Sequence, residues 1–417
     1  MNRLVFAMAM VGFAFSQSAY ALQATDGDWP RWRGPSGNGV APAGQDVPFS
    51  WSDTENVIWK QPVFGRGHSS PTVVGDRIFM ATADERNQIQ YVIAHDRKTG
   101  SEVWRKEVSR GGFPNTHPKN THATCTIACH DDLMFVAFHH HDKVTLACLD
   151  FDGKQQWKED VAKYAPRLYE YGYAPSPVFY GSNVIVAGDY EGGGFIAAYD
   201  RKTGKRAWKK ARPKLLSFSA PVIANVAGSD QLLLSGCNLV SSYDPGTGKK
   251  KWSARGTTMA TCGTMVWDGD LVFASGGYPK AETVCVNAKS GKVVWRNNQK
   301  CYEQSMLAHQ GYVYAVADSG VAYCWRAADG KVMWKKRMSR PISASPVLVG
   351  DTIMLSVESG RTFVFKANPN KFEEVAKNQL GDEAFATPTV CGNRIYLRVA
   401  RREQGQRQEY RYCVGKK

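Results

Sequence analysis

The sequence predicts an all-β fold, an eight-bladed β-propeller of four-stranded antiparallel blades. Three observations predict it: a repeated turn motif that ends in tryptophan, a regular spacing of this motif, and strand-like segments that open each repeat. Successive tryptophans of the motif lie 53, 51, 44, 43 and 39 residues apart. Periods of about 40 to 50 residues with strand composition are typical of propeller blades. The 417 residues are therefore expected to form one closed array, although length alone suggests two or three domains.

The repeated motif places an Asp or a similar residue before a glycine turn and a tryptophan after it. The first copy is DRKTGSEVW, from Asp96 to Trp104. The Asp carboxylate can accept hydrogen bonds from the turn backbone, and the glycine allows a positive φ. A tryptophan that recurs in each fourth strand is expected to bury its area between neighbouring blades. The later copies end at Trp157, Trp208, Trp252, Trp295 and Trp334.

Each repeat opens with two short strands joined by a tight turn, as in PTVVGDRIFMATA from Pro71 to Ala83. There are eight such openings, but no tryptophan strand follows the last one, which begins near Ala386. Trp59, in contrast, has no opening before it. Residues near Asn56 to Lys60 are therefore expected to pair with the C-terminal blade and close the ring. Closure would remove the exposed sheet edges that promote aggregation.

The repeat resembles that of the PQQ-like (pyrroloquinoline-quinone-like) β-propeller family from about Asn56 to the C-terminus. The segment DWPRWRGPSGNGVAP, from Asp28 to Pro42, also resembles the leader of secreted members. The resemblance implies the propeller architecture. The family holds quinoprotein alcohol and sugar dehydrogenases and also non-catalytic propellers, such as the scaffold of outer-membrane protein assembly. It therefore leaves both functional classes open.

The amino terminus has the three-part layout of a secretory signal peptide. A positive charge at Arg3 precedes an apolar run from Leu4 to Phe15 and a small-residue site ending at Ala21. We expect residues 1–21 to be this signal, 22–55 to be an extension packed on the ring, and 56–417 to be a single propeller. No apolar stretch approaches the length of about 20 residues that spans a bilayer. The expected location is periplasmic or secreted.

The chain is strongly basic, with a formal net charge of +15. Because an exported protein does not meet nucleic acid, an unknown protein or an anionic polymer is the expected partner. Part of the charge recurs around the glycine turns and forms a basic rim on one face. A monomer is expected. The rim residues are Lys98, Lys202, Lys205, Lys249 to Lys251, Lys289, Lys292 and Lys331.

The family resemblance raises the question of PQQ as a cofactor. In quinoprotein alcohol dehydrogenases, two adjacent cysteines, calcium ligands and a catalytic Asp surround the quinone. No two of the ten cysteines here are adjacent, and the short repeats leave little room for catalytic loops. The segment CTIACH, from Cys125 to His130, also departs from the C-x-x-C-H pattern of haem attachment. No catalytic residue is assigned, and the cofactor stays unknown.

The mouth of the central channel is the expected ligand site, because loops that join blades gather there. The predicted ligand-binding residues are His68, Lys119, Asn120, His122, Tyr171, Tyr173 and Glu303. Alignment of the first strands predicts a ring of His68, Ala123, Ala174, Phe218, Thr261, Glu303, Ser343 and Phe385 near this mouth. The consecutive His139, His140 and His141 are a candidate metal site, and a polar loop surface is the alternative.

These observations favour an exported binding or scaffold module for a protein, a polysaccharide or a small ligand at the channel mouth. The alternative is a PQQ- or metal-dependent oxidoreductase similar to alcohol or sugar dehydrogenases. The isolated cysteines and short loops favour the non-catalytic class, and the question of enzymatic activity is left open.

Overall fold

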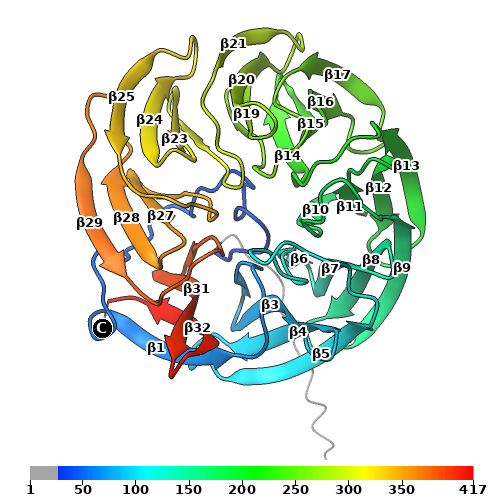
Figure 1. Cartoon of the computed structure of the whole chain (residues 1–417), viewed down its shortest axis with the longest axis vertical. Coiled ribbons are helices and arrows are strands. Elements are labelled where there is room, and N and C mark those ends of the chain that lie inside the picture. Colours follow the sequence, from blue (N-terminus) through cyan, green and yellow to red (C-terminus); the bar gives the residue numbers. More distant parts are fainter. Residues whose placement is uncertain (1–26, 417) are drawn as a thin grey trace, which may run out of the picture.

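The structure is a computed structural model that describes residues 27–416. Eight four-stranded sheets surround a central axis, and every neighbouring strand pair is antiparallel (Figure 1). The described residues form strands, turns and loops without an α-helix, so none of them builds a helix that could cross a membrane. The predicted eight-bladed propeller is confirmed. The predicted signal, residues 1–21, lies outside the described residues.

Each blade runs from a short first strand at the axis to a fourth strand on the outside. Blades 1 and 2 are β2 (Thr72–Val74), β3 (Arg77–Asp84), β4 (Ile89–Asp96), β5 (Glu102–Arg110), β6 (Ala128–His130), β7 (Leu133–His140), β8 (Lys143–Asp150) and β9 (Gln155–Lys163). Blades 3 and 4 are β10 (Val178–Tyr180), β11 (Asn183–Gly188), β12 (Gly194–Asp200), β13 (Arg206–Arg212), β14 (Val222–Val226), β15 (Ser229–Gly236), β16 (Leu239–Tyr243) and β17 (Lys250–Arg255).

The second half of the ring repeats this arrangement. Blades 5 and 6 are β18 (Val266–Asp268), β19 (Leu271–Gly276), β20 (Glu282–Asn287), β21 (Val293–Asn297), β22 (Leu307–His309), β23 (Tyr312–Val316), β24 (Val321–Arg326) and β25 (Val332–Arg337). Blades 7 and 8 are β26 (Val347–Val349), β27 (Thr352–Ser356), β28 (Arg361–Lys366), β29 (Glu374–Gln379), β30 (Thr389–Cys391), β31 (Arg394–Glu403), β32 (Gln406–Val414) and β1 (Val57–Val63).

The ring closes as predicted, because the first strand of the chain completes the last blade. β1 pairs antiparallel with β32, and Trp59 lies opposite Cys413. A buried ion pair strengthens the seam between blades 8 and 1: Arg398 Nη2 lies 2.6 Å from Glu409 Oε2. Arg398 also donates to the Ala81 carbonyl at 2.8 Å, and the Gly67 amide donates to Glu409 at 3.1 Å. Blade 8 is therefore fixed to blade 1 by charge-assisted hydrogen bonds.

The repeated tryptophans pack between blades, which confirms their predicted architectural role. The Trp157 indole donates to the Arg201 carbonyl of the next blade at 2.8 Å. The turn glycine of that blade, Gly204, covers the indole ring so closely that an added Cβ would lie 2.8 Å from Trp157. Gly204 also has a φ of 70°. The motif thus needs glycine for both conformation and space.

All ten cysteines are free thiols, and nine of them are buried. Cys148, Cys285 and Cys324 lie directly opposite the tryptophans of their own blades. This position takes a small buried side chain, and a free thiol packs there as a small hydrophobic group.

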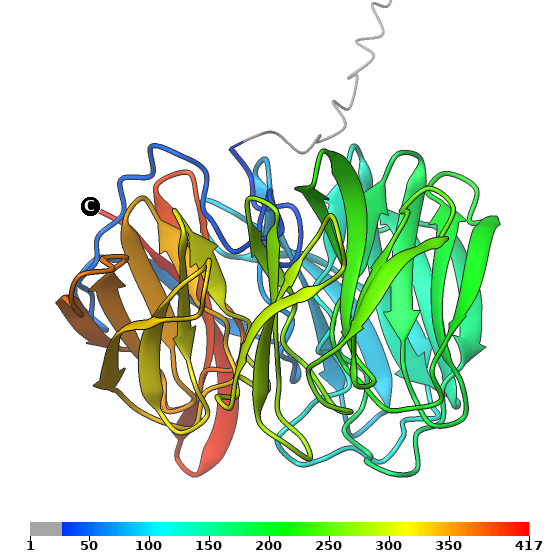
Figure 2. The same cartoon turned by 90° about the horizontal axis from the view of Figure 1, so that it is seen from above.

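The N-terminal extension crosses the channel on the face that carries the first hairpin turns (dark blue in Figures 1 and 2). Trp29 and Val73 exchange backbone hydrogen bonds of 2.9 and 3.0 Å in blade 1. The buried Arg33 donates to the Met306 carbonyl at 2.7 Å in blade 6, and Ala41 donates to Leu348 at 2.8 Å in blade 7. The extension therefore closes this end of the channel.

Candidate ligand-binding cavity

A ring of hydroxyl side chains connects the blades at the channel wall. In six of the eight seams, a backbone N–H donates to the hydroxyl oxygen of the equivalent residue in the next blade, at 2.9 to 3.1 Å. The blade 4 position is Ala220, which has no hydroxyl group and interrupts the ring. Next to this gap, the Thr264 hydroxyl accepts a hydrogen bond of 2.9 Å from the Trp32 indole of the extension.

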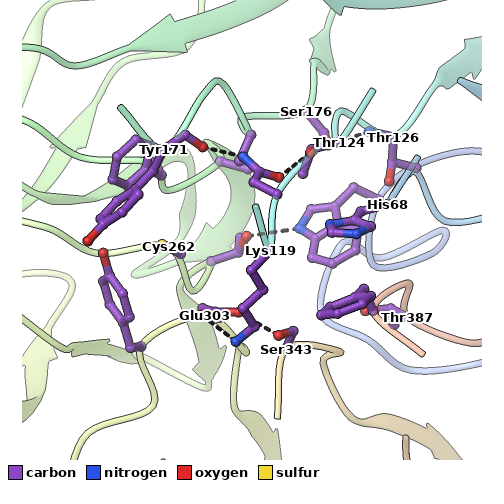
Figure 3. Close-up of a pocket in the computed structure, with 18 of the residues that line it drawn as sticks. His68, Lys119, Thr124, Thr126, Tyr171, Ser176, Cys262, Glu303, Ser343 and Thr387 are labelled. Atoms are coloured by element: carbon purple, nitrogen blue, oxygen red, sulfur yellow. Dashed lines mark hydrogen bonds and ion pairs between the residues drawn. The ribbon is translucent and has the colours of Figure 1, made fainter. Parts of the chain in front are cut away.

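A cavity of about 420 Å³ lies on the axis (Figure 3). Its walls come from the loops that join successive blades, and Trp32 also lines it. Because these loops and the extension lie on opposite faces of the ring, Trp32 forms the floor and the cavity opens on the inter-blade loop face. A concave site with a few converging polar groups is the usual location of a ligand.

One wall of the cavity carries a compact ionic cluster. Lys119 Nζ lies 2.9 Å from Glu303 Oε1 and 2.5 Å from Glu358 Oε1. Ser343 Oγ lies 2.5 Å from Glu303 and 2.6 Å from Glu358 (Figure 3 shows the Glu303 contacts). Burial favours a lower pKa for Lys119, but the two carboxylates outweigh burial and the pKa is raised. Lys119 therefore stays charged and paired.

Aromatic rings lead from the cavity to its rim. The Tyr171 ring lies 5.8 Å from that of Phe218 inside the cavity and stacks on Tyr169 at 5.6 Å. Tyr169 meets Tyr278 edge-on at 5.3 Å, and Tyr278 is 46% exposed. These contacts give the site a continuous apolar side that extends to solvent.

His68 occupies the wall beside Phe385, with ring centroids 4.4 Å apart. Its Nε2 is buried and has no hydrogen-bond partner among the described residues. Burial, followed by the charge of Arg66, holds the pKa of His68 well below its usual value. The imidazole is therefore neutral.

Five of the seven predicted ligand-binding residues line the cavity: His68, Lys119, Asn120, Tyr171 and Glu303. Asn120 is itself fixed, because its Oδ1 accepts a hydrogen bond of 2.7 Å from Thr124 and its amide donates to the Tyr171 carbonyl. The structure thus brings together residues from four different inter-blade loops.

The other two predicted residues, His122 and Tyr173, do not line this cavity, and their expected positions are corrected. His122 stacks on Phe113 at 4.2 Å and approaches Glu85 at 3.3 Å, so its ring lies in the loops of blade 1. Tyr173 is buried between blades, where its hydroxyl donates to the Ala187 carbonyl at 2.8 Å.

Six of the eight residues predicted to ring the mouth line the cavity. In the other two blades, the residue that lines the cavity is the one directly after the predicted residue. Thr124 and Cys262 line the cavity where Ala123 and Thr261 were expected. The carbonyls of Ala123 and Thr261 accept seam hydrogen bonds, and their side chains are fully buried.

Sequence reasoning missed Trp32, Tyr302 and Glu358. Trp32 and Tyr302 line the cavity, and Glu358 pairs with Lys119 behind its wall. The sequence does contain a pattern that could have pointed to Glu358. This residue stands directly before a Ser-Gly pair, and Asp318 stands before the same pair in the preceding blade. Trp32 lies outside the repeats, so repeat alignment could not place it.

The three consecutive histidines do not converge on one point. His139 and His140 end β7 on alternate sides of the strand. His139 packs edge-on against Tyr164 at 4.9 Å, and His140 Nε2 lies 3.0 Å from the Thr145 hydroxyl. His141 lies in the following turn with a φ of 48°. Residues 27–416 contain no group of three or more His, Cys, Asp or Glu side chains placed to hold a metal ion.

The fold and the cavity define a closed PQQ-like propeller whose axial pocket is sealed at one end. Residues 88–336, more than half of the chain, match the family model described as outer membrane protein assembly factor BamB. The chain belongs to this family.

One relative is the outer membrane protein assembly factor BamB of Burkholderia pseudomallei (strain K96243). It is 24% identical over 353 residues, which cover 80% of this chain and 82% of the relative. The structure of BamB from Moraxella catarrhalis has a TM-score of 0.60 at 14% identity and covers 85% of this chain and 96% of its own. The structure of a quinohemoprotein alcohol dehydrogenase from Comamonas testosteroni has a TM-score of 0.67 at 14% identity. The match covers 94% of this chain and 81% of the dehydrogenase chain. These two structures share the fold.

Proposed function

We propose that this protein is an exported, non-catalytic binding module whose ligand enters the axial cavity. The observation that carries the proposal is the pocket itself, which has a floor, Trp32, supplied from outside the repeats. The relative in Burkholderia pseudomallei is named an assembly factor for outer-membrane proteins, which supports a scaffold role at the cell envelope and a periplasmic or secreted location.

The charge balance of the cavity favours a neutral polar ligand. An anionic ligand would meet Glu303 in the wall, with Glu358 behind it, whereas a cationic one would have to displace Lys119 from both carboxylates. The aromatic side, formed by Tyr171 and Phe218, suits the apolar face of a sugar ring. A saccharide unit therefore has the combination of hydroxyl groups and apolar faces that this cavity matches.

The cavity residues do not fit PQQ. This cofactor is a tricarboxylic acid and needs cationic partners, but Lys119 is the only Lys or Arg among the described residues that line the cavity. Lys119 is already paired with two glutamates. Only one cysteine, Cys262, lines the site, so no pair of adjacent cysteines faces a bound quinone.

Calorimetric titration with a panel of mono- and oligosaccharides tests the proposal. Ala174→Trp places an indole in the cavity and should abolish binding, whereas Ala207→Trp, at an exposed position of β13, should leave the Kd unchanged. Saccharide binding that survives Ala174→Trp, or a panel in which no saccharide binds, would contradict it.

A further inference from the structure

The net charge of the protein arises in one continuous part of the ring, which holds three whole blades and the last strand of another. Residues 201–340, which run from the last turn of blade 3 to the loop after blade 6, contain 23 Lys and Arg against 8 Asp and Glu. Their excess of 15 equals the charge of the whole chain. We call residues 201–340 the basic half, and residues 27–200 with 341–416 the balanced half. The basic half spans β13 to β25 in Figure 1.

Most basic side chains of the basic half have no acidic partner. Five of its 23 Lys and Arg form ion pairs, including the buried Arg212 with Asp189 at 2.8 Å. The other 18 are exposed, and none forms an ion pair with a described residue. Flexible, unpaired charges of one sign create a strong local potential.

Equivalent strands of the two halves show how this difference arises. In β5 of the balanced half, Glu102 and Glu107 pair with Arg105 and Arg110. In β13 of the basic half the same positions, counted from the tryptophan, carry Arg206 and Ala211. The blade architecture is the same, so the loss of acidic residues is not a requirement of the fold.

The unpaired charges include the turns between third and fourth strands of blades 3 to 6. Because antiparallel strands alternate in direction, these turns lie on the face crossed by the N-terminal extension, opposite the cavity mouth. They present Lys202, Lys205, Lys249, Lys289, Lys292 and Lys331 on that face. Val294 and Val332, 43% and 48% exposed, lie beside the turns of blades 5 and 6.

We propose that the basic half docks on an anionic lipid bilayer through this face. A flat surface can touch all four turns together, whereas a linear polyanion would have to bend along the arc of four blades. The exposed valines can bury apolar surface at the boundary between lipid headgroups and acyl chains. A charged polysaccharide offers no such apolar layer. Basic residues near an anionic bilayer each strengthen binding about 5-fold. Docking in this orientation leaves the cavity mouth directed away from the membrane.

Co-sedimentation with vesicles tests the proposal. The protein should bind mixed phosphatidylglycerol and phosphatidylcholine vesicles at low ionic strength, and pure phosphatidylcholine vesicles much less. The triple variant K202E/K249E/K289E should lower the partition coefficient by about 100-fold. The matched control K98E/K154E/K371E changes the equivalent turns of blades 1, 2 and 7 by the same total charge, and it should lower partitioning far less.

Three results would overturn the proposal. They are absence of binding to anionic vesicles at low ionic strength, an equal loss in both triple variants, and binding to dextran sulfate without binding to vesicles. An equal loss would show that net charge acts without regard to position. The third result would assign the surface to a soluble polyanion.

Discussion

The balanced half and the basic half of the ring share one blade architecture but place their charged groups differently. In the balanced half, Arg398 and Glu409 are buried as an ion pair, and eight of the nine histidines lie between His68 and His141. In the basic half, most Lys and Arg side chains are exposed and unpaired. A buried charge depends on its partner, whereas an exposed one is solvated without it. Loss of a buried ion pair should therefore cost more stability than loss of an exposed one, and surface binding should depend on the basic half.

The largest expected effect comes from breaking the buried ion pair at the seam between blades 8 and 1. Glu409→Gln leaves Arg398 buried without a counter-charge and should lower the free energy of unfolding by about 3–5 kcal/mol. Urea denaturation followed by tryptophan fluorescence measures this change. Glu282→Gln, which removes the partner of the exposed Arg296 in the basic half, is the control and should cost less than about 1 kcal/mol. Equal losses in the two variants would remove the distinction between the halves.

Ring closure was predictable from the sequence, but the ion pair that fixes it was not. The count of openings and tryptophans left Trp59 without a blade, and only pairing with the C-terminal blade could complete the array. Arg398 and Glu409 have no counterparts in the other repeats. Their contacts reach Ala81 and Gly67, more than 300 residues away in the sequence. Such a pairing depends on the closed ring and not on local pattern.

The site residues that lie at equivalent positions of the repeats could be predicted from the sequence. Alignment of first strands placed His68 and Glu303 on the cavity wall, because equivalent residues of a propeller face the same axis. It did not find Trp32, since this residue reaches the channel through a segment outside the repeats. His122 was expected at the mouth from its place in an inter-blade loop, but this long loop folds back on its own blade and its side chains follow no strand alternation.

The second expected effect is a loss of stability in acid to which two buried histidines of blade 2 contribute. Burial lowers the pKa values of His139 and His140 to about 4 in the folded protein. The unfolded chain binds these protons near pH 6.5, so folding is favoured above that pH and the contribution is lost progressively toward pH 4. Each histidine should contribute at most about 3 kcal/mol to this loss.

Unfolding free energies at about pH 7 and pH 5 measure this dependence. The double variant His139→Gln/His140→Gln should show a shallower decline than the unmodified protein. An identical decline in both proteins would place the acid sensitivity elsewhere, for example in the carboxylates of the ion pairs.

The smallest expected effect compares two residues at the same repeat position, directly after a tryptophan. In the balanced half, Arg105 pairs with Glu102 at 3.0 Å and its guanidinium lies 3.6 Å from the centre of the Phe64 ring. In the basic half, Lys335 is exposed and forms no ion pair with a described residue. Arg105→Ala should cost about 1 kcal/mol, and Lys335→Ala should change the free energy of unfolding by less than about 0.5 kcal/mol.

This last comparison tests whether the fold needs one basic side chain that lies outside the turns of the basic half. If Lys335→Ala is neutral in urea denaturation, the fold does not need that charge, as is usual for an exposed side chain. If Lys335→Ala destabilises as much as Arg105→Ala, the lysine packs along the blade through its alkyl chain. Its charge would then accompany a structural role, and Lys335 would not count among the side chains that are free to act in surface binding.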